Sequence, residues 1–315
     1  MKIVVLEPLG IKQEDLVTKI NEAVGNAAEV VFYETRKEDV ATLIERSKDA
    51  DAVVLSNFKF PREVIENCPK LKYICVAFTG YDHVDMECCK ERGIVVSNCA
   101  GYSTVAVADL VFGFVIDLYR SVIKCNEVVR HGGTKNGLIG PELEGKKFGI
   151  IGCGAIGSRV ARIANAFGCE VFAYSRTVKE IPGVTFVSLD ELLSSCDIIS
   201  LHVPQNAQTI GLMNAENIAK MKKSAILINT ARGPVVDSQA LADALNSGAI
   251  AGAAIDVYEK EPPINEDHPL LQAKNCICTP HVAFATTQAM YKRADIVANN
   301  IKQYLSGNPV NVVSK

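Results

Sequence analysis

One glycine-rich segment constrains the fold more than any other part of this sequence. Its three glycines, Gly152, Gly154 and Gly157, fill the spacing G-x-G-x-x-G. The apolar run Phe148–Ile151 before them predicts a buried parallel strand, and Arg159–Phe167 after them has helical character. A helix N-terminus offers unpaired backbone N–H groups and the positive end of a dipole. This order of strand, turn and helix therefore predicts a site for the pyrophosphate of a dinucleotide.

The residues after the next expected strand, Glu170–Tyr174, bear on which dinucleotide binds. NAD sites usually place a carboxylate there for the ribose 2′-hydroxyl. This chain has Ser175, Arg176 and Thr177 instead. Arg176 can pair with a 2′-phosphate and the two hydroxyls can donate to it, so the sequence favours NADP. In the alternative interpretation Arg176 is a solvated arginine or stacks on the adenine, and NAD is used.

Expected strands and helices alternate along all 315 residues, which predicts an α/β protein with two doubly wound parallel-sheet domains. The first expected sheet resembles the flavodoxin-like type and is complete near Asn98. The last expected helix, Thr286–Leu305, has no strand left to accompany it in the second domain and is assigned to the first. We therefore predict a discontinuous substrate domain, residues 1–99 and 286–315. A Rossmann nucleotide domain would span residues 100–285, with the active site in the cleft between the two.

A long helical stretch, Gly101–Val129, is apolar over much of its surface, and Ser103 or Thr104 would begin it. A helix of that character must be buried on more than one side. We predict that it covers the nucleotide domain and also meets a second subunit. The alternative is burial within one chain.

Composition and charge narrow the class of protein. The net charge of −3 and a pI near 6.0 leave no electrostatic footprint for nucleic acid or an anionic membrane. No signal peptide and no membrane span are expected, and eleven cysteines, many within apolar runs, suggest reduced thiols in a cytoplasmic protein. Cys276 and Cys278 have no second pair at zinc spacing, so we interpret them as structural and expect no metal.

The segment Phe78–Asp85 follows an expected strand, at the sheet edge where open α/β folds bind ligands. Gly80 permits a backbone conformation in which successive N–H groups converge on a carboxylate. The alternative is a plain turn between a strand and a helix. We interpret His83 as structural, because no second catalytic group accompanies it.

Three residues past strand ends in the second domain suggest the chemistry. Arg232, Glu261 and His281 lie far apart in sequence but fall on the same expected sheet edge. Arginine can grip a carboxylate and polarise a carbonyl, histidine can supply a proton, and a carboxylate can orient the imidazole. This set fits hydride transfer to a 2-oxo acid.

Each of the three also has a plain interpretation. Arg232 could cap a surface turn, Glu261 could be one more exposed charge, and His281 could be a buried structural histidine. Three unrelated structural roles on one sheet edge, beside a dinucleotide-binding loop, are much less expected than one shared active site.

Several motifs together resemble the D-isomer-specific 2-hydroxyacid dehydrogenase family over essentially the whole chain. These motifs are Gly152–Gly157, Asn229–Gly233 with Val236-Asp237, Asp256–Pro262 and Pro280-His281. The resemblance implies that His281 is the acid–base residue, Glu261 its carboxylate partner and Arg232 the substrate arginine. It also implies that the backbone at Thr79 and Gly80 captures the substrate carboxylate.

The resemblance also implies the remaining cofactor contacts. Thr230 and Asp256 would contact the nicotinamide, and Val203 and Pro204 would form a wall of the nucleotide pocket. Ala155 and Ile156, between the second and third glycines, would also contact the cofactor. Family members are usually homodimers joined through their nucleotide domains, which agrees with the long apolar helix.

The segment Ala283–Thr286 is similar to the glycerate dehydrogenase and hydroxypyruvate reductase branch, whose members usually have Trp where this chain has Phe284. Residues 307–313 also resemble that branch, and no regulatory domain of the phosphoglycerate dehydrogenase type is expected. We therefore predict an NAD(P)-dependent reductase of a small 2-oxo acid such as hydroxypyruvate or glyoxylate. The alternative is a corepressor-like protein that binds NAD(H) as a sensor.

Overall fold

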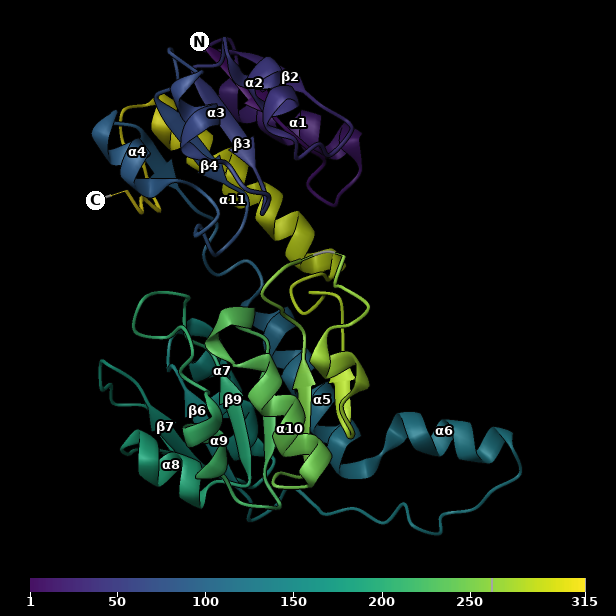
Figure 1. The fold of residues 1–315 in the computed structure, drawn as a ribbon. Coiled ribbons are helices and arrows are strands. Elements are labelled where there is room, and N and C mark those ends of the chain that lie inside the picture. Colours follow the sequence, from purple (N-terminus) through teal and green to yellow (C-terminus); the bar gives the residue numbers. More distant parts are fainter. Residues whose placement is uncertain (262, 315) are drawn as a thin grey trace. The chain divides into compact units, whose positions relative to one another are not determined.

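The chain forms two compact units, each built on a parallel sheet. The computed structural model describes residues 1–261 and 263–314. One unit contains residues 1–103 and 285–315, and the other contains residues 104–284. The sequence-based boundaries lay at 99/100 and 285/286. Both units alternate strands with helices (Figure 1), so the expected α/β class with two doubly wound sheets is confirmed.

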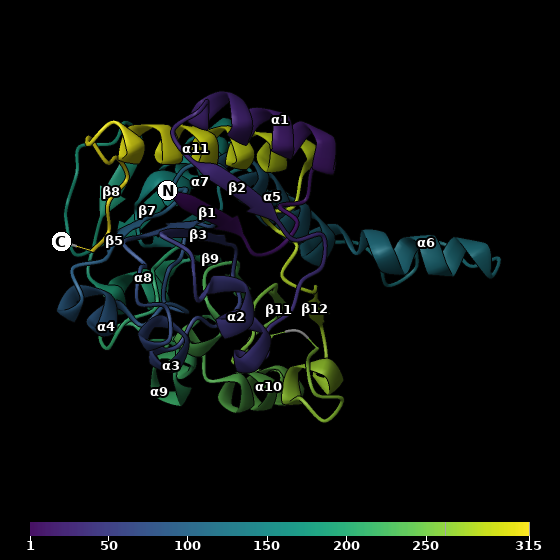
Figure 2. The same ribbon diagram turned by 90° about the horizontal axis from the view of Figure 1, so that it is seen from above.

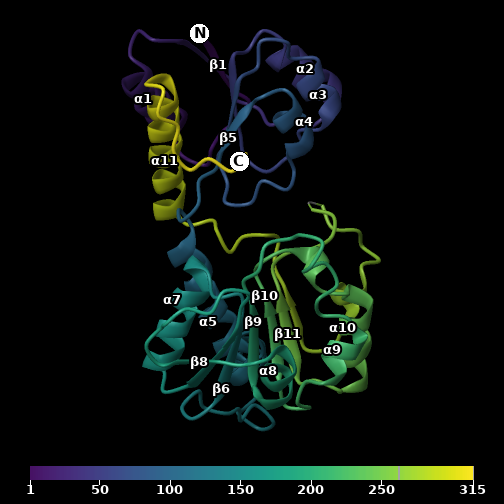
Figure 3. The ribbon, with the colours of Figure 1, turned by 90° about the vertical axis from the view of Figure 1, so that its left-hand side faces the viewer.

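The first unit has a five-stranded sheet in the order β2-β1-β3-β4-β5, the flavodoxin-like order that the sequence predicted. Its strands are β1 (Lys2–Val5), β2 (Glu29–Phe32), β3 (Ala52–Leu55), β4 (Tyr73–Val76) and β5 (Val95–Ser97). Its helices are α1 (Gln13–Val24), α2 (Val40–Ser47), α3 (Arg62–Glu66), α4 (Met86–Glu91) and α11 (Thr287–Leu305). Figure 3 shows α1 and α11 on one face of the sheet and α2, α3 and α4 on the other. Strands β3 and β4 are buried along their whole length, which explains their unbroken apolar sequences.

The last helix belongs to the first unit, although the whole second unit precedes it in the chain. The Tyr291 hydroxyl donates to the carboxylate of Asp15 on α1 at 2.5 Å. The Tyr304 ring stacks on Tyr73 of β4, with centroids 4.0 Å apart. Helix α11 therefore covers one face of a sheet whose strands all lie near the N-terminus.

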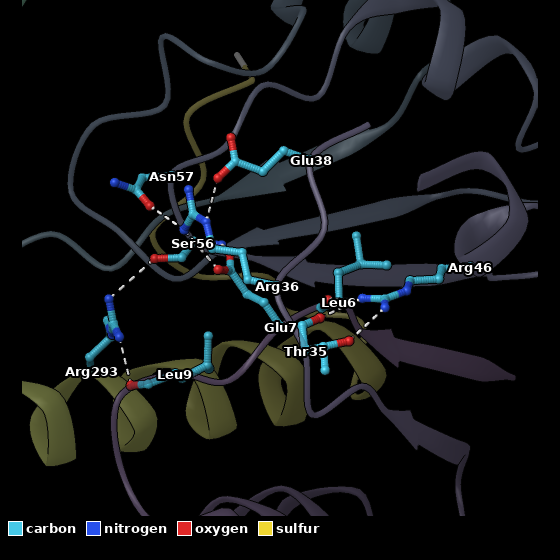
Figure 4. A network of polar contacts seen from close by, with 10 residues as sticks. All are labelled: Leu6, Glu7, Leu9, Thr35, Arg36, Glu38, Arg46, Ser56, Asn57 and Arg293. Atoms are coloured by element: carbon cyan, nitrogen blue, oxygen red, sulfur yellow. Dashed lines mark hydrogen bonds and ion pairs between the residues drawn. The ribbon is translucent and has the colours of Figure 1, made fainter. Parts of the chain in front are cut away.

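A buried polar network lies past the carboxyl ends of β1 and β3 (Figure 4). Glu7 is 2% exposed and accepts hydrogen bonds from the Ser56 backbone N–H at 2.7 Å and from Arg36 at 2.8 Å. Burial raises the pKa of the Glu7 carboxyl, although the Arg36 guanidinium opposes that shift. Arg293 of α11 donates to the Leu9 carbonyl at 2.6 Å and to the Ser56 hydroxyl at 3.2 Å. The network thus fixes α11 against the strand ends of its own unit.

The second unit has a seven-stranded sheet in the order β12-β11-β10-β9-β6-β7-β8. Its strands are β6 (Lys147–Ile151), β7 (Glu170–Tyr174), β8 (Val184–Phe186), β9 (Ile198–Leu201), β10 (Ile226–Asn229), β11 (Gly252–Ile255) and β12 (Cys276–Cys278). From β6 onward this is the Rossmann order with one further strand at the edge. The sequence did not predict β8, because this three-residue strand is only half-buried and lacks an apolar run.

Helices cover both faces of the second sheet. The covering helices are α5 (Thr104–Arg120), α7 (Ala155–Ala166), α8 (Leu189–Ser195), α9 (Ala215–Ala219) and α10 (Ser238–Ser247). The unit also contains α6 (Val122–Arg130) and the short 3₁₀ turns η1 (Gly233–Val235) and η2 (Pro269–Gln272). Side chains of α5 and α7 form one core with the sheet, and those of α8, α9 and α10 form another. Within β10, Leu227 belongs to the second core and Ile228 to the first, as strand alternation requires.

The prediction of one long helix over residues 101–129 is wrong in one respect. The chain breaks it at Ser121, whose φ of 50° lies in the left-handed region. Helix α5 before the break is buried along one side, but α6 after it has no buried residue. Figures 1 and 2 show α6 projecting from the rest of its unit. Apolar content alone predicted burial for both halves.

None of the helices in the described parts of the chain combines the length and apolar character needed to cross a bilayer.

Candidate active site

The glycine loop between β6 and α7 is shaped by two close backbone approaches. Gly152 has a φ of 97°, and a Cβ there would lie 2.6 Å from the carbonyl oxygen of His202. A Cβ at Gly157 would lie 2.2 Å from the carbonyl oxygen of Gly152. A Cβ at Gly154, in contrast, would meet no described atom within 4 Å. Packing therefore requires the first and third glycines, whereas the second faces open space into which a ligand fits.

Helix α7 begins immediately after Gly154, four residues earlier than the sequence predicted. Ala155 is exposed and Ile156 is half-buried in its first turn. The unpaired N–H groups of this turn and the helix dipole favour an anion beside Gly154. The arrangement fits the pyrophosphate of a dinucleotide.

The residues predicted to select the dinucleotide lie on the neighbouring strand at the same edge. Strand β7 pairs with β6, and the Gly152 N–H donates to the Tyr174 carbonyl at 2.8 Å. The chain continues into Ser175, which is half-buried, and then Arg176 and Thr177, which are exposed.

On the other side of β6, strand β9 leads into the predicted pocket wall. Val203 is half-buried and Pro204 is exposed. The preceding His202 lies 2.9 Å from the Ser200 hydroxyl through Nε2, and burial lowers the pKa of this imidazole to about 3. His202 is therefore neutral at ordinary pH, and its main chain supports the glycine loop.

The loop after β10 is held by Asn229, whose side chain is completely buried. Its amide donates to the Arg232 carbonyl at 3.0 Å and accepts from the Ala231 N–H at 3.0 Å. Thr230 between them has a buried hydroxyl without a hydrogen-bond partner in residues 1–261 and 263–314. A buried hydroxyl of this kind is costly unless a ligand satisfies it, so Thr230 fits a polar ligand group such as a carboxamide.

Gly233 explains how the arginine loop meets the next strand. A Cβ at Gly233 would lie 2.0 Å from the carbonyl carbon of Tyr258, so only glycine permits this approach. Arg232 and the turn that carries Glu261 are consequently neighbours in space, although 29 positions separate them in the chain. The Arg232 guanidinium also donates to the Ala231 carbonyl at 2.8 Å.

Glu261 and His281 form a direct pair. Glu261 Oε2 contacts His281 Nδ1, and Glu261 Oε1 accepts a hydrogen bond from the Tyr258 N–H at 2.6 Å. Both side chains are 17% exposed. Glu261 is thus not a simple surface charge, and His281 is open enough to meet a ligand. Pro262, the last residue of the motif Asp256–Pro262, lies outside the described residues.

Two neighbours set the position of the imidazole. His281 has a φ of 53°, and its N–H donates to the Asp256 carbonyl at 2.8 Å. The Phe284 ring meets the imidazole edge-on at 5.4 Å between centroids. Phe284 stands where members of the hydroxypyruvate reductase branch usually have Trp, and its ring packs on the candidate acid–base residue.

Asp256 holds the backbone on both sides of His281 in place, a role that the sequence did not predict. Its side chain is 0% exposed and accepts hydrogen bonds from the Thr279 hydroxyl at 2.6 Å and from the N–H groups of Val282 and Ala283 at 2.8 and 2.9 Å. Burial raises the pKa of this carboxyl, although these hydrogen bonds oppose the shift. Asp256 thus organises the loop around His281, and its contact with nicotinamide stays a prediction.

The predicted carboxylate loop lies in the first unit, at the end of β4. Thr79 and Gly80 are both half-buried there. The Asn98 side chain donates to the Thr79 carbonyl at 2.7 Å and so fixes the loop. Capture of a substrate carboxylate by this backbone stays a prediction.

Comparison with known proteins gives a consistent result. Residues 112–283 match the family described as "D-isomer specific 2-hydroxyacid dehydrogenase, NAD binding domain". The chain is 42% identical to a hydroxypyruvate reductase of Blautia hydrogenotrophica, with 100% of each chain covered. It is 40% identical to a glyoxylate reductase of Thermococcus litoralis, over 87% of this chain and 86% of the relative. Among solved structures, an acyclic imino acid reductase (Bsp5) in complex with NADPH and D-Arg has a TM-score of 0.92 at 32% identity, with 99% of this chain and 100% of that chain covered.

The fold, the glycine loop and the Glu261–His281 pair define a nicotinamide-dependent oxidoreductase with two α/β units. The chain belongs to the D-isomer-specific 2-hydroxyacid dehydrogenase family. The comparisons do not favour the alternative of a corepressor-like sensor.

Proposed function

We propose that this protein reduces a small 2-oxo acid, hydroxypyruvate or glyoxylate, to the corresponding 2-hydroxy acid. The observation that carries the proposal is the Glu261–His281 pair, which lies in the same unit as Arg232 and past the carboxyl ends of the same sheet. Relatives that are named hydroxypyruvate reductase and glyoxylate reductase support the choice of substrate.

In this proposal His281, Arg232 and Glu261 have distinct roles. Because His281 Nδ1 faces the Glu261 carboxylate, we assign Nε2 of the same ring to deliver a proton to the C2 oxygen. Arg232 binds the substrate carboxylate and polarises the carbonyl that is reduced. Glu261 holds the imidazole in one orientation. The backbone at Thr79 and Gly80 would bind the carboxylate as well.

The residues around the glycine loop would hold the cofactor. When bound, a nicotinamide dinucleotide supplies the hydride. Gly152, Gly154 and Gly157, with the first turn of α7, would bind its pyrophosphate, and the unsatisfied Thr230 hydroxyl would bind the carboxamide. Ala155 and Ile156 lie in that turn, while Val203, Pro204 and Asp256 complete the proposed contacts. Ser175, Arg176 and Thr177 support NADP as the preferred form, with NAD as the alternative.

The proposed assembly is a homodimer joined through the nucleotide-binding units. Its support is α6, where Val122, Ile123 and Val129 are 52%, 56% and 67% exposed. Apolar side chains gathered on one projecting helix are typical of a surface that another chain covers. A cytoplasmic location is proposed as well, because all eleven cysteines are free thiols.

The direct test measures the loss of NADPH or NADH absorbance with a panel of 2-oxo acids. We expect turnover of hydroxypyruvate and glyoxylate, and His281→Ala should reduce kcat roughly 10²- to 10⁴-fold while the Kd for NADPH stays unchanged. His131→Ala, on the exposed end of α6, is the matched control and should retain full activity. Normal turnover by His281→Ala would remove His281 from the proton role. Tight cofactor binding without turnover of any 2-oxo acid would instead support the sensor.

A further inference from the structure

Cys276 and Cys278 are two thiols in direct contact on an edge strand. Residues two apart in a strand point to the same side, and the two Sγ atoms are 3.8 Å apart. Both residues are half-buried, and among the described strands β12 pairs only with β11. The sequence alone predicted a structural role for them, because spacing cannot show whether two sulfurs meet.

Other cysteines of the chain show what is particular to this pair. Cys75 and Cys99 also interact through their side chains, but both are 0% exposed, so a reagent in solution does not reach them. Cys125 on α6 is half-buried, and its Sγ donates to the Arg120 carbonyl at 3.6 Å. The pair on β12 combines contact between two sulfurs with partial exposure.

The contact between the two sulfurs also favours the thiolate form of one of them. The hydrogen bond from Cys276 lowers the pKa of Cys278 below its ordinary value, although burial opposes that shift. As a thiol, Cys278 lies 3.6 Å from the Leu270 carbonyl, and as a thiolate it accepts the hydrogen bond from Cys276. The thiolate is the form that attacks a disulfide.

The strand that carries the two cysteines leads directly to the candidate acid–base residue. Thr279 follows Cys278, and its hydroxyl donates to the buried Asp256 carboxylate at 2.6 Å. Two residues later the His281 N–H donates to the Asp256 carbonyl at 2.8 Å. A displacement of the short strand β12 is therefore transmitted to the loop that positions His281.

We propose that Cys276 and Cys278 form a redox-active dithiol, and that its oxidation to a disulfide slows the reaction at His281. The oxidant is a low-molecular-weight disulfide of the glutathione type. The Cys278 thiolate attacks one of its sulfurs and releases one thiolate. Cys276 then loses its proton and attacks the Cys278 sulfur, which releases the second thiolate. Two protein thiols are oxidised by two electrons, and the disulfide reagent is reduced to two thiols.

Formation of the Cys276–Cys278 disulfide requires strand β12 to move, and this movement would displace the loop that positions His281. The sulfurs must approach from 3.8 Å to about 2.05 Å, across two positions of an extended strand. Because β12 has three residues and one neighbouring strand, it can shift at lower cost than a central strand. A disulfide closed under strain is also easily reduced, so the effect is reversible by a dithiol reductant.

The experiment incubates the full-length protein with oxidised glutathione and reads both mass and activity. The activity reading rests on the proposed function, whereas the mass reading does not. We expect the intact protein to lose two hydrogens, and a peptide that contains Cys276 and Cys278 to carry the new bond. Turnover of hydroxypyruvate should fall roughly tenfold or more, since small displacements of catalytic groups have such effects, and dithiothreitol should restore it.

The controls separate this site from other thiols. Cys276→Ser should form only a glutathione adduct and no internal bond, whereas Cys125→Ser should respond as the wild type does. A lasting adduct on wild-type Cys278 without an internal bond would overturn the proposal. Formation of the bond with unchanged turnover would overturn it as well. If no 2-oxo acid is reduced at all, the proposed function fails, while the mass reading still decides whether the dithiol is redox-active.

Discussion

Gly154 and Gly157 stand three residues apart in one loop, yet they are glycines for different reasons. A side chain at Gly157 would collide with the Gly152 carbonyl, whereas one at Gly154 would meet only the space that a dinucleotide would fill. Gly157→Ala should therefore lower the free energy of unfolding by about 1–3 kcal/mol. Gly154→Ala should leave the free energy of unfolding almost unchanged but weaken NADPH binding roughly tenfold, about 1.4 kcal/mol. Urea unfolding and calorimetric titration would check the two results, and equal loss of stability in both variants would contradict the assignment.

Arg176 is the side chain on which the proposed preference for NADP rests. It is exposed at the end of β7, where a 2′-phosphate would lie. Arg176→Ala should raise the KM for NADPH about tenfold or more, because hydrogen bonds to charged groups contribute about 1.5–3 kcal/mol. The KM for NADH should change little. If the two KM values rise together, the preference for NADP is wrong.

His202 makes the stability of its unit depend on pH. Its folded pKa of about 3 lies below the ordinary value of 6.5, so between these values the unfolded chain binds a proton that the folded chain does not. Stability should therefore fall as the pH drops below 6.5, by at most about 1.4 kcal/mol per pH unit. Urea unfolding across this range should give a shallower dependence for His202→Gln. An identical dependence in the two proteins would show that His202 is protonated in the folded state.

At the scale of elements, α6 differs from the other long helices because none of its residues is buried in its own chain. Replacing Val122, Ile123 and Val129 by lysine should convert the proposed dimer into a monomer without unfolding it, since none of the three side chains is buried within the chain. Sedimentation velocity would measure the mass. Val178→Lys is the matched control, because this valine is 70% exposed at a different place, after β7. A triple variant that stays dimeric at the same concentration would show that α6 is not the interface.

Elements also show where sequence reasoning succeeds and where it stops. Runs such as Val53–Leu55 are apolar and β-branched, so their local pattern already indicates a strand that is buried on both faces. Strand β8 has no such pattern, because pairing with β7 rather than burial creates it. The break between α5 and α6 is caused by a single residue, Ser121, in the left-handed conformation, and the hydrophobic periodicity of the sequence does not predict it.

At the scale of the whole molecule, the sheet edge that carries the candidate residues was predictable, but their geometry was not. Parallel strands of a Rossmann sheet end at one edge, so the order of elements already indicated that Arg232, after β10, and His281, after β12, share that edge. The contacts that hold these two residues in place could not be predicted from the order of elements. Gly233 against the Tyr258 backbone and the buried Asp256 carboxylate are contacts between distant segments, and a single sequence carries no local signal for them.

The position of α11 has a consequence for how the chain is made. The Lys292 ammonium donates to the Gly101 carbonyl at 2.9 Å, so the place where the chain leaves the first unit and the place where it returns are neighbours. A ribosome completes all five strands of the first sheet long before it reaches Thr287. Until then the sheet face that α11 will occupy has no cover from that helix, while the intervening 181 residues are translated as one uninterrupted block. The N-terminal third of the polypeptide must therefore wait in an unfinished state, exposed to chaperones and proteases, for its own last helix to emerge.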